Sequence, residues 1–157
     1  MKLVTSLAIC LLGAGSLFAT SLIEKSVSNG LKAIPADKAE LMKLIDDKND
    51  PITKEKVELG KKLYFDPRIS KSGLISCNTC HNVGLGGADG IPAAIGHGWT
   101  ANPHHLNSPT VYNSVFFKAQ FWDGRSPHLA DQAQGPVQAG PEMAAPPSLV
   151  EQRINSI

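Results

Sequence analysis

The 157-residue sequence has almost no net charge: 15 lysine and arginine residues stand against 14 aspartate and glutamate residues. A protein that binds nucleic acid or an anionic lipid surface through its overall charge would carry a clear positive excess. The balance therefore argues against both kinds of partner. The length by itself favours a single domain.

The sequence also lacks an apolar run long enough to cross a membrane. Its most apolar stretch, residues 3–18, follows Lys2 and leads to Ala19 and then to polar sequence. A positive start, a short apolar stretch and a small residue at its end are typical of a secretory signal peptide, with a buried N-terminal helix as the alternative. We predict that residues 1–19 are a signal peptide, that residues 20–157 form the mature domain without a membrane span, and that the protein is exported.

Cysteine is scarce, and its scarcity limits the kinds of site. Of three cysteines, Cys10 lies in the predicted signal peptide, which leaves Cys77 and Cys80. A structural zinc site would need two more ligands at familiar spacing, but there is no second cysteine pair, and six residues separate His97 from His104. A thioredoxin-like dithiol would need a preceding strand in a βαβ context, which the sequence around the pair does not offer.

The cysteine pair belongs to the motif "CNTCH", residues 77–81, which is the pattern for covalent attachment of a c-type haem. Residues i and i+3 share one face of a helical turn, so both thiols can reach the two vinyl groups of one porphyrin. The next residue, His81, can reach the iron from the same side. We therefore predict that Cys77 and Cys80 bind haem c and that His81 is the proximal iron ligand. The predicted export agrees, because this attachment takes place outside the cytoplasm.

His97 is a candidate for the sixth ligand of the iron. It follows the motif after a glycine-rich linker that is pliable and long enough to cross a haem. Gly96 and Gly98 flank it and allow close approach of the backbone. Met42 and Met143 are competing ligand candidates, and a plain loop histidine is the alternative for His97.

The charged part of the sequence predicts helices. Residues 32–71 carry ten basic and eight acidic residues, and apolar residues recur at helical spacing in "ADKAELMKLIDDK" and "TKEKVELGKKLYF". Asp50-Pro51 and Asp66-Pro67 are expected to end these two helices.

The following part is irregular. Residues 82–147 carry only two basic and four acidic residues but nine glycines and eight prolines, together with large apolar side chains such as Trp99 and Trp122 that need burial. Such a chain is suited to wrapping a bulky apolar cofactor. The predicted fold class is therefore mainly α: a c-type cytochrome domain, helical and loop-rich around a covalently bound haem.

The last ten residues predict the start of another helix. Ser148 and Glu151 have the spacing of a capping box, and an apolar face begins before the sequence stops at Ile157. We expect this last helix to be incomplete and the sequence to be a fragment of a longer protein.

Six motifs taken together resemble a known family: "ELGKKLYFDPRIS", "CNTCH", "IGHGW", "NSPTVYNS", "AQFWDGR" and "QAQGPVQAGPEM". In this order they are similar to the N-terminal haem domain of bacterial di-haem cytochrome c peroxidases, over roughly residues 54–157. The resemblance implies a periplasmic enzyme that reduces hydrogen peroxide to water with electrons from a small cytochrome c or cupredoxin. It also implies that the complete protein is a homodimer.

The resemblance implies roles around the peroxidatic haem, the one that meets peroxide. Cysteines matching Cys77 and Cys80 anchor this haem, and a histidine matching His81 is its proximal ligand. A histidine matching His97 caps the iron in the oxidised state and leaves when a second haem is reduced.

Other residues gain a role through the resemblance, and without it each would be assigned to a loop, the surface or the core. A glutamate matching Glu142 is the distal acid/base, and a glutamine matching Gln132 lies near it. A tryptophan matching Trp122 lies between the two haems, and an asparagine matching Asn107 belongs to a calcium site at the domain boundary. Arg125, in the expected turn "DGR", can meet a haem propionate, with a surface ion pair as the alternative.

The sequence departs from the family in one respect: a second CxxCH and its methionine ligand are not in these 157 residues. Two other functions therefore stay open. One is a mono-haem c-type cytochrome that transfers electrons without catalysis. The other is a related di-haem oxidase that acts on protein residues during cofactor maturation, although relatives of that kind can lack the distal histidine.

Overall fold

The computed structural model describes residues 21–156, so the predicted signal peptide, residues 1–19, lies outside the described residues. The chain divides into two units, Met1–Leu44 and Ile45–Ile157. In the described part of the first unit, residues 21–28 are helical, and α2 (Lys38–Ile45) follows after an extended segment. None of the described helices is both long and apolar enough to cross a membrane.

The expected helix in "ADKAELMKLIDDK" is confirmed, but it ends earlier than Asp50-Pro51. Two aspartates follow α2, and their carboxylates accept hydrogen bonds from backbone N–H groups further along the chain. Asp46 Oδ1 accepts from Ile52 at 2.7 Å, and Asp47 Oδ1 accepts from Asn49 at 2.8 Å. These bonds stabilise a turn in place of another helical turn, which is the usual competition between short polar side chains and a helix.

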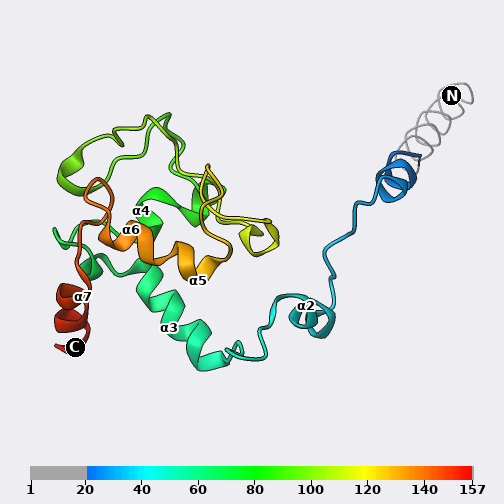
Figure 1. The fold of residues 1–157 in the computed structure, drawn as a ribbon, viewed down its shortest axis with the longest axis horizontal. Coiled ribbons are helices and arrows are strands. Elements are labelled where there is room, and N and C mark those ends of the chain that lie inside the picture. Colours follow the sequence, from blue (N-terminus) through cyan, green and yellow to red (C-terminus); the bar gives the residue numbers. More distant parts are fainter. Residues whose placement is uncertain (1–20, 157) are drawn as a thin grey trace, which may run out of the picture. The chain divides into compact units, whose positions relative to one another are not determined.

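The second unit is built from short helices and loops (Figure 1). Its α-helices are α3 (Lys54–Phe65), α4 (Cys77–Cys80), α5 (Leu129–Gln132), α6 (Gln134–Gln138) and α7 (Pro147–Ile154), and its 3-10 helices are η1 (Pro67–Ile69), η2 (Val83–Leu85), η3 (His97–Trp99) and η4 (Ser114–Phe116). Between residues 21 and 156 there are isolated β-bridges but no strand. The expected class, mainly α and loop-rich, is confirmed.

Helix α3 begins and ends where the sequence predicts. Thr53 is its N-cap and accepts a hydrogen bond from the backbone of Lys56 at 3.2 Å. Asp66 follows its last residue, and the Asp66 carboxylate accepts from the backbone of Arg68 at 2.9 Å, which caps η1. The same aspartate therefore closes one helix and opens the next. The C-terminal end of α3 packs against α4, the helix that carries the cysteine pair.

The core of this unit is small. Its buried apolar side chains are Ile69, Ile75, Met143 and Ala145, and Leu63, Val137 and Val150 pack against them from α3, α6 and α7. Met143, a competing candidate for the iron, is only 4% exposed, and its packing in this core accounts for its burial.

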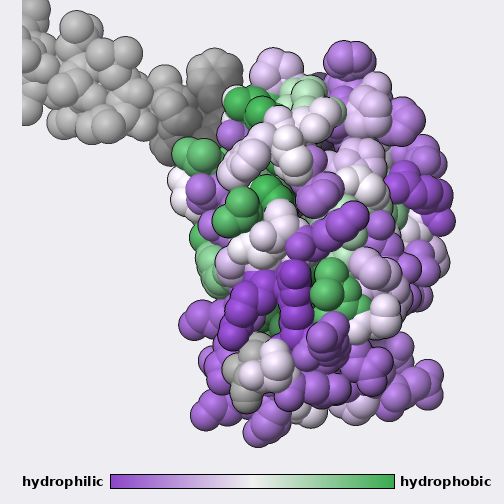
Figure 2. All heavy atoms as spheres, turned by 90° about the vertical axis from the view of Figure 1, so that its left-hand side faces the viewer, coloured by the Kyte–Doolittle hydropathy of each residue, from purple (hydrophilic) through white to green (hydrophobic). Residues whose placement is uncertain are grey.

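The large apolar side chains of the irregular part contribute little to this core. Trp99 is 65% exposed and Trp122 is 61% exposed, while Phe116 and Phe117 are also exposed. On the face drawn in Figure 2, apolar residues occur in small groups separated by polar ones. The polypeptide by itself therefore buries few of the residues that its sequence marks as apolar anchors.

Helix α7 corrects the prediction of a capping box. The helix begins at Pro147, one residue before Ser148, and its N-cap Pro146 makes no side-chain cap bond. A proline in the first turn has its φ preset for the helix and needs no capping partner for its missing N–H, so it starts this helix in place of a serine cap. The helix ends at Ile154, and the expectation that the last helix is incomplete stays a prediction.

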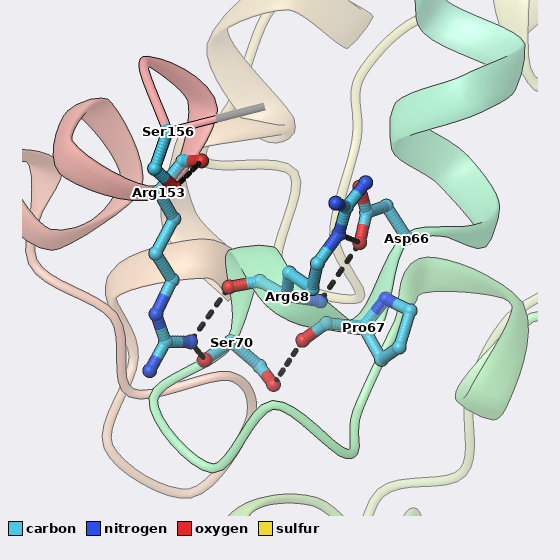
Figure 3. Close-up of polar contacts among 6 residues, drawn as sticks. All are labelled: Asp66, Pro67, Arg68, Ser70, Arg153 and Ser156. Carbon is cyan, nitrogen blue, oxygen red and sulfur yellow. Dashed lines mark hydrogen bonds and ion pairs between the residues drawn. The ribbon is translucent and has the colours of Figure 1, made fainter.

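Arg153 joins α7 to η1 and the loop after it. Its guanidinium donates to the carbonyl oxygen of Arg68 at 2.6 Å and to that of Ser70 (Figure 3). It also donates to the carbonyl oxygen of Lys71 at 3.1 Å. A planar guanidinium can satisfy several carbonyls at once, which a lysine could not do with the same geometry. The C-terminal helix thereby holds the segment that leads to the cysteine pair.

Candidate haem site

The two thiols lie at the first and last positions of a single helical turn, α4. Cys77 is the first residue of the turn and Cys80 the last. Ser76, directly before the turn, donates its backbone N–H to Thr79 Oγ1 at 2.9 Å. The i, i+3 spacing puts both sulfurs on one face. Burial raises the pKa of both thiols, and that of Cys80 reaches about 11. For Cys80, the negative charges of nearby carboxylates add to the effect. Both cysteines therefore stay protonated at neutral pH.

The ring of His81 is held by a carbonyl from a distant part of the chain. Its Nδ1 lies 2.9 Å from the carbonyl oxygen of Pro109. A carbonyl can only accept, so Nδ1 carries the proton and the lone pair stays on Nε2, the atom available for a metal. A ligand histidine is commonly oriented by a hydrogen bond of this kind.

Both tyrosines of the sequence hold the main chain around this histidine. The Tyr64 hydroxyl, from α3, donates to the carbonyl of His81, and the Tyr112 hydroxyl donates to the carbonyl of Val83. Burial raises the pKa of Tyr64 to about 12, so its hydroxyl stays a donor throughout the physiological range. The proximal segment is therefore fixed from two sides.

His97 lies at the start of η3, against the segment that carries Glu142. Its backbone N–H donates to the carbonyl of Glu142 at 2.7 Å. Its ring atom Nδ1 is buried and has no hydrogen-bond partner among the described residues. An unpaired buried polar atom costs about 1–3 kcal/mol, so such an atom calls for a functional reason.

The Glu142 carboxyl is half-buried in a site with charge of the opposite sign close by. Burial raises its pKa above the ordinary value, and Arg125 and His81 act in the opposite direction, towards a lower pKa. The carboxyl therefore lies within electrostatic reach of both. A carboxylate whose pKa is raised is a better proton acceptor near neutral pH, as acid–base catalysis requires.

Arg125 forms the contacts of a turn residue. It pairs with Asp123 at 2.9 Å, and its guanidinium lies over the ring of Phe121, 3.4 Å from the centroid. The turn predicted for "DGR" is present, with Gly124 at a φ of 69°. The arginine sits on an aromatic face near Glu142, with its side chain 58% exposed and able to reach an anionic group.

The structure joins two other candidate residues and leaves a third apart. The indole Nε1 of Trp122 donates to the backbone carbonyl of Asn107 at 3.0 Å. Gln132 is the half-buried last residue of α5, and its side chain makes no hydrogen bond within residues 21–156. Sequence reasoning missed Tyr64 and Tyr112 as site residues, although Tyr112 lies in the same motif as Pro109.

These residues fit a covalently bound haem. Two thiols share a helical face, one imidazole presents Nε2, and a second has a buried nitrogen without a partner. The exposed aromatic side chains suit a large apolar group, which would bury them. Within residues 21–156 no group of three or more His, Cys, Asp or Glu side chains is placed to hold a metal ion by itself. Two thiols together with imidazoles are donors of the kind that a covalently bound porphyrin iron uses.

Comparison with known proteins decides the family. Residues 54–157 match the family described as di-haem cytochrome c peroxidase. The chain belongs to this family. The resemblance drawn from the six motifs is thus confirmed, and with it the expectation of a c-type cytochrome domain.

Individual di-haem peroxidases and related proteins are similar over most of the chain. It is 50% identical over 155 residues to "Cytochrome c551 peroxidase" of Pseudomonas aeruginosa, covering 94% of this chain and 42% of that protein. It is 44% identical over 110 residues to "Methylamine utilization protein MauG" of Methylorubrum extorquens, covering 70% and 31%. The chain therefore spans less than half the length of these curated relatives.

A solved structure of the same family type supports the fold. A "MauG-like protein associated with microbial copper homeostasis" superposes with a TM-score of 0.63 at 26% identity, over 70% of this chain and 32% of the other. The arrangement of short helices and loops is therefore shared with that protein over 70% of this chain.

Proposed function

We propose that this chain is the peroxidatic haem domain of a periplasmic cytochrome c peroxidase, which reduces hydrogen peroxide to water. The reaction consumes two electrons and two protons per peroxide and yields two waters. A small cytochrome c or a cupredoxin supplies the electrons by way of a second haem, in the part of the complete protein that lies outside this sequence. Residues 1–19 direct export, and the complete protein forms a homodimer.

The observation that carries this proposal is the placement of Glu142. Its carboxyl has a pKa raised by burial, lies within electrostatic reach of His81 and Arg125, and belongs to a residue whose main chain is bonded to His97. A simple electron carrier has no use for a half-buried carboxyl at this place.

In this proposal Cys77 and Cys80 hold the porphyrin through thioether bonds, and His81 binds its iron through Nε2. The haem supplies redox equivalents and a Lewis-acidic iron that binds peroxide. The Pro109 carbonyl would keep the proton on His81 Nδ1 and raise the basicity of Nε2, the atom that would hold the iron.

Glu142 moves the proton that the reaction needs. Its carboxylate would accept a proton from one oxygen of the peroxide and return it to the other, as release of that oxygen as water requires. Gln132 hydrogen-bonds the peroxide, and Arg125 binds a haem propionate. His97 would be the second histidine that holds the iron in the oxidised protein, and its release on reduction would open the site to peroxide.

Two further residues act at the boundary to the second haem domain. Trp122 lies on the path of electrons between the haems, and Asn107 contributes to a calcium site. The hydrogen bond from the Trp122 indole to the Asn107 carbonyl supports a link between these two roles. A hard cation such as calcium prefers carbonyl oxygens of this kind.

One other function has an observation in its favour. The similarity to a protein named for methylamine utilization suggests an oxidase that acts on a protein substrate. Such an enzyme would keep its iron open in the oxidised state, whereas this proposal gives the oxidised iron two histidine ligands. A high-spin spectrum of the oxidised wild-type protein would therefore favour the oxidase.

The decisive experiment removes the proton-transfer group in a protein whose iron is already open. His97→Gly opens the sixth position, and Glu142→Gln is then added to that haem-loaded variant. Acid–base groups contribute about 10²–10⁴-fold, so the second-order rate with peroxide should fall about a hundredfold or more in stopped-flow measurements.

The control adds Glu151→Gln to the same background, since this exposed carboxylate lies on α7. Its rate should match that of His97→Gly alone. An unchanged rate in the Glu142→Gln variant, with haem content equal by absorbance, would remove Glu142 from the mechanism.

A further inference from the structure

The main chain at residues 96–97 lies directly on the main chain at residues 141–142. The Cβ of any side chain at Gly96 would lie 2.1 Å from the carbonyl oxygen of Pro141 and 2.7 and 2.8 Å from the carbonyl oxygen and Cα of Glu142. All three obstacles are backbone atoms, so no change of rotamer could relieve the clash. Glycine is therefore the residue that permits this approach.

The two glycines beside His97 serve different purposes. Gly98 has a φ of 70°, in the left-handed region, and its nearest neighbour would be 3.5 Å from an added Cβ. Gly96 has a φ of −118° and a ψ of −137°, a combination outside the main regions of other residues, and the three nearest atoms to an added Cβ are all backbone. Gly98 is needed for its conformation, whereas Gly96 is needed also for a contact.

The surface that receives Gly96 is itself firmly held. Met143 N–H donates to the carbonyl of Pro136 at 3.1 Å, and Ala145 N–H donates to that of Val137 at 2.8 Å. The Met143 side chain packs in the core, and its carbonyl accepts from the backbone of Lys71 at 2.8 Å. The loop at 139–145 is thus tied to the rest of the unit on both sides.

The segment around His97 has fewer such ties. Its own bonds close a small loop, from Gly96 N–H to the Thr100 carbonyl at 3.2 Å and from Trp99 N–H to the Gly96 carbonyl at 3.0 Å. The bond from His97 N–H to Glu142 is the one that joins it to the held loop at 139–145. Further ties lie just before Gly96, where the Ala94 N–H donates to the carbonyl of Leu106 at 3.0 Å and the Ile95 carbonyl accepts from the Cys80 thiol at 3.5 Å. Of the two segments, the one with His97 therefore has the fewer bonds to the rest of the unit.

We propose that Gly96 makes a main-chain latch, the close contact of residues 96–97 with residues 141–142, which sets the position of His97 relative to Glu142. While this contact is made, the distal histidine is held in one position. Loss of the contact separates the histidine from the loop at 139–145. The effect on iron ligation rests on the proposed function, whereas the effect on the His97 amide rests on the contact alone.

The test compares Gly96→Ala with Gly140→Ala in the haem-loaded protein. Gly140 belongs to the loop at 139–145, which Gly96 contacts. It has no left-handed φ and has nothing within 4 Å of an added Cβ, so it is a matched control. Amide hydrogen exchange at His97 should be on the order of tenfold or more faster in Gly96→Ala, since the bond to Glu142 is lost, and unchanged in Gly140→Ala. The oxidised haem should also shift towards a high-spin spectrum only in Gly96→Ala.

Equal exchange at His97 in both variants would overturn the latch, whatever the spectrum shows. Faster exchange combined with a spectrum that neither Gly96→Ala nor His97→Gly alters would support the latch and refute His97 as a ligand. Should Gly96→Ala fail to bind haem, the wild-type protein decides: the His97 amide must exchange more slowly than that of Gly98, and equal rates refute the latch.

Discussion

The imidazole of His81 is oriented by atoms that lie far from it in the sequence. Its Nδ1 bonds to a carbonyl 28 residues away, and its own carbonyl accepts from Tyr64, 17 residues before it. The first bond orients the ring, and the second holds the main chain that carries it. The orientation of the candidate proximal ligand is thus a property of the folded unit rather than of the motif.

The thiols of this motif lead to a prediction about covalent attachment. Cys77→Ala combined with Cys80→Ala should abolish the haem that stays bound to the denatured chain, because both thioether bonds are lost. The measurement is haem staining after denaturing electrophoresis. His104→Ala, at an exposed position, should retain its haem. Haem that stays on the denatured double variant would refute covalent attachment through this pair.

The candidate ligands could be proposed from the sequence, but the groups that orient their side chains could not. "CNTCH" carries its chemistry in consecutive side chains, so spacing alone reveals it. The partners of the site are often main-chain carbonyls, such as those of Pro109 and Glu142. A carbonyl is present at every residue, so the identity of the side chain gives no sign of such a role.

At the scale of elements, Asp66 connects α3 to η1. It follows the last residue of α3, caps η1 through the Arg68 backbone, and pairs with the Arg68 guanidinium at 2.6 Å. Its side chain is only 13% exposed. This junction sets the direction in which the chain leaves α3 for the loop before α4.

Asp66→Ala should therefore destabilise the haem-loaded protein by about 1 kcal/mol, the usual cost of a lost cap. Denaturant unfolding at pH 7 measures the change. Asp50→Ala provides the control, because its carboxylate pairs with Lys56 on the surface and should contribute less than about 0.5 kcal/mol. A loss for Asp66→Ala no larger than that of Asp50→Ala would contradict the capping role.

The effect of Asp66 should also depend on pH in a definite direction. The hydrogen bond and charge of Arg68 hold the pKa of Asp66 below its ordinary value of 3.8. A carboxyl with a lowered pKa stabilises the fold above its unfolded pKa, and this contribution is lost as the pH falls through the folded pKa. The difference between wild type and Asp66→Ala should thus shrink below about pH 4, and a constant difference would speak against it.

Helix positions were predictable where local signals are strong. Thr53 starts α3 through its side chain, and the Asp66 side chain, which directly follows α3, starts η1; the sequence displays both residues. The end of α2 and the start of α7 depended on competition between neighbouring groups: aspartate side chains captured N–H groups after Ile45, and Pro147 started α7 ahead of Ser148. Spacing rules do not weigh such competitors against each other.

For the whole molecule, the small core makes the polar clamp of Arg153 important. One guanidinium satisfies three carbonyls between residues 68 and 71 and thereby joins α7 to η1. Removal of the side chain would leave the partly buried carbonyl of Ser70 without this donor and return the other two carbonyls to water. The clamp supplements the few apolar contacts between these elements.

Arg153→Ala should lower the free energy of unfolding of the haem-loaded protein by about 1–3 kcal/mol, because charged hydrogen bonds are lost. Arg153→Lys should recover only part of this, since an ammonium cannot span the three carbonyls. The exposed neighbour Gln152→Ala is the control and should lie within about 0.5 kcal/mol of wild type. Equal stability of the alanine and lysine variants would show that the fork geometry does not matter.

The same clamp also bears on the order in which the chain folds. Its hydrogen bonds join residues 82 to 85 positions apart, so a large loop must close before they form. Closing such a loop costs chain entropy before any contact compensates for it, which makes contacts of this kind late and slow. Single turns such as α4 need only neighbours in sequence. Thiols and proximal imidazole can therefore assume their helical spacing early, while the loop leading to them is still loose enough to admit a molecule as large as a porphyrin.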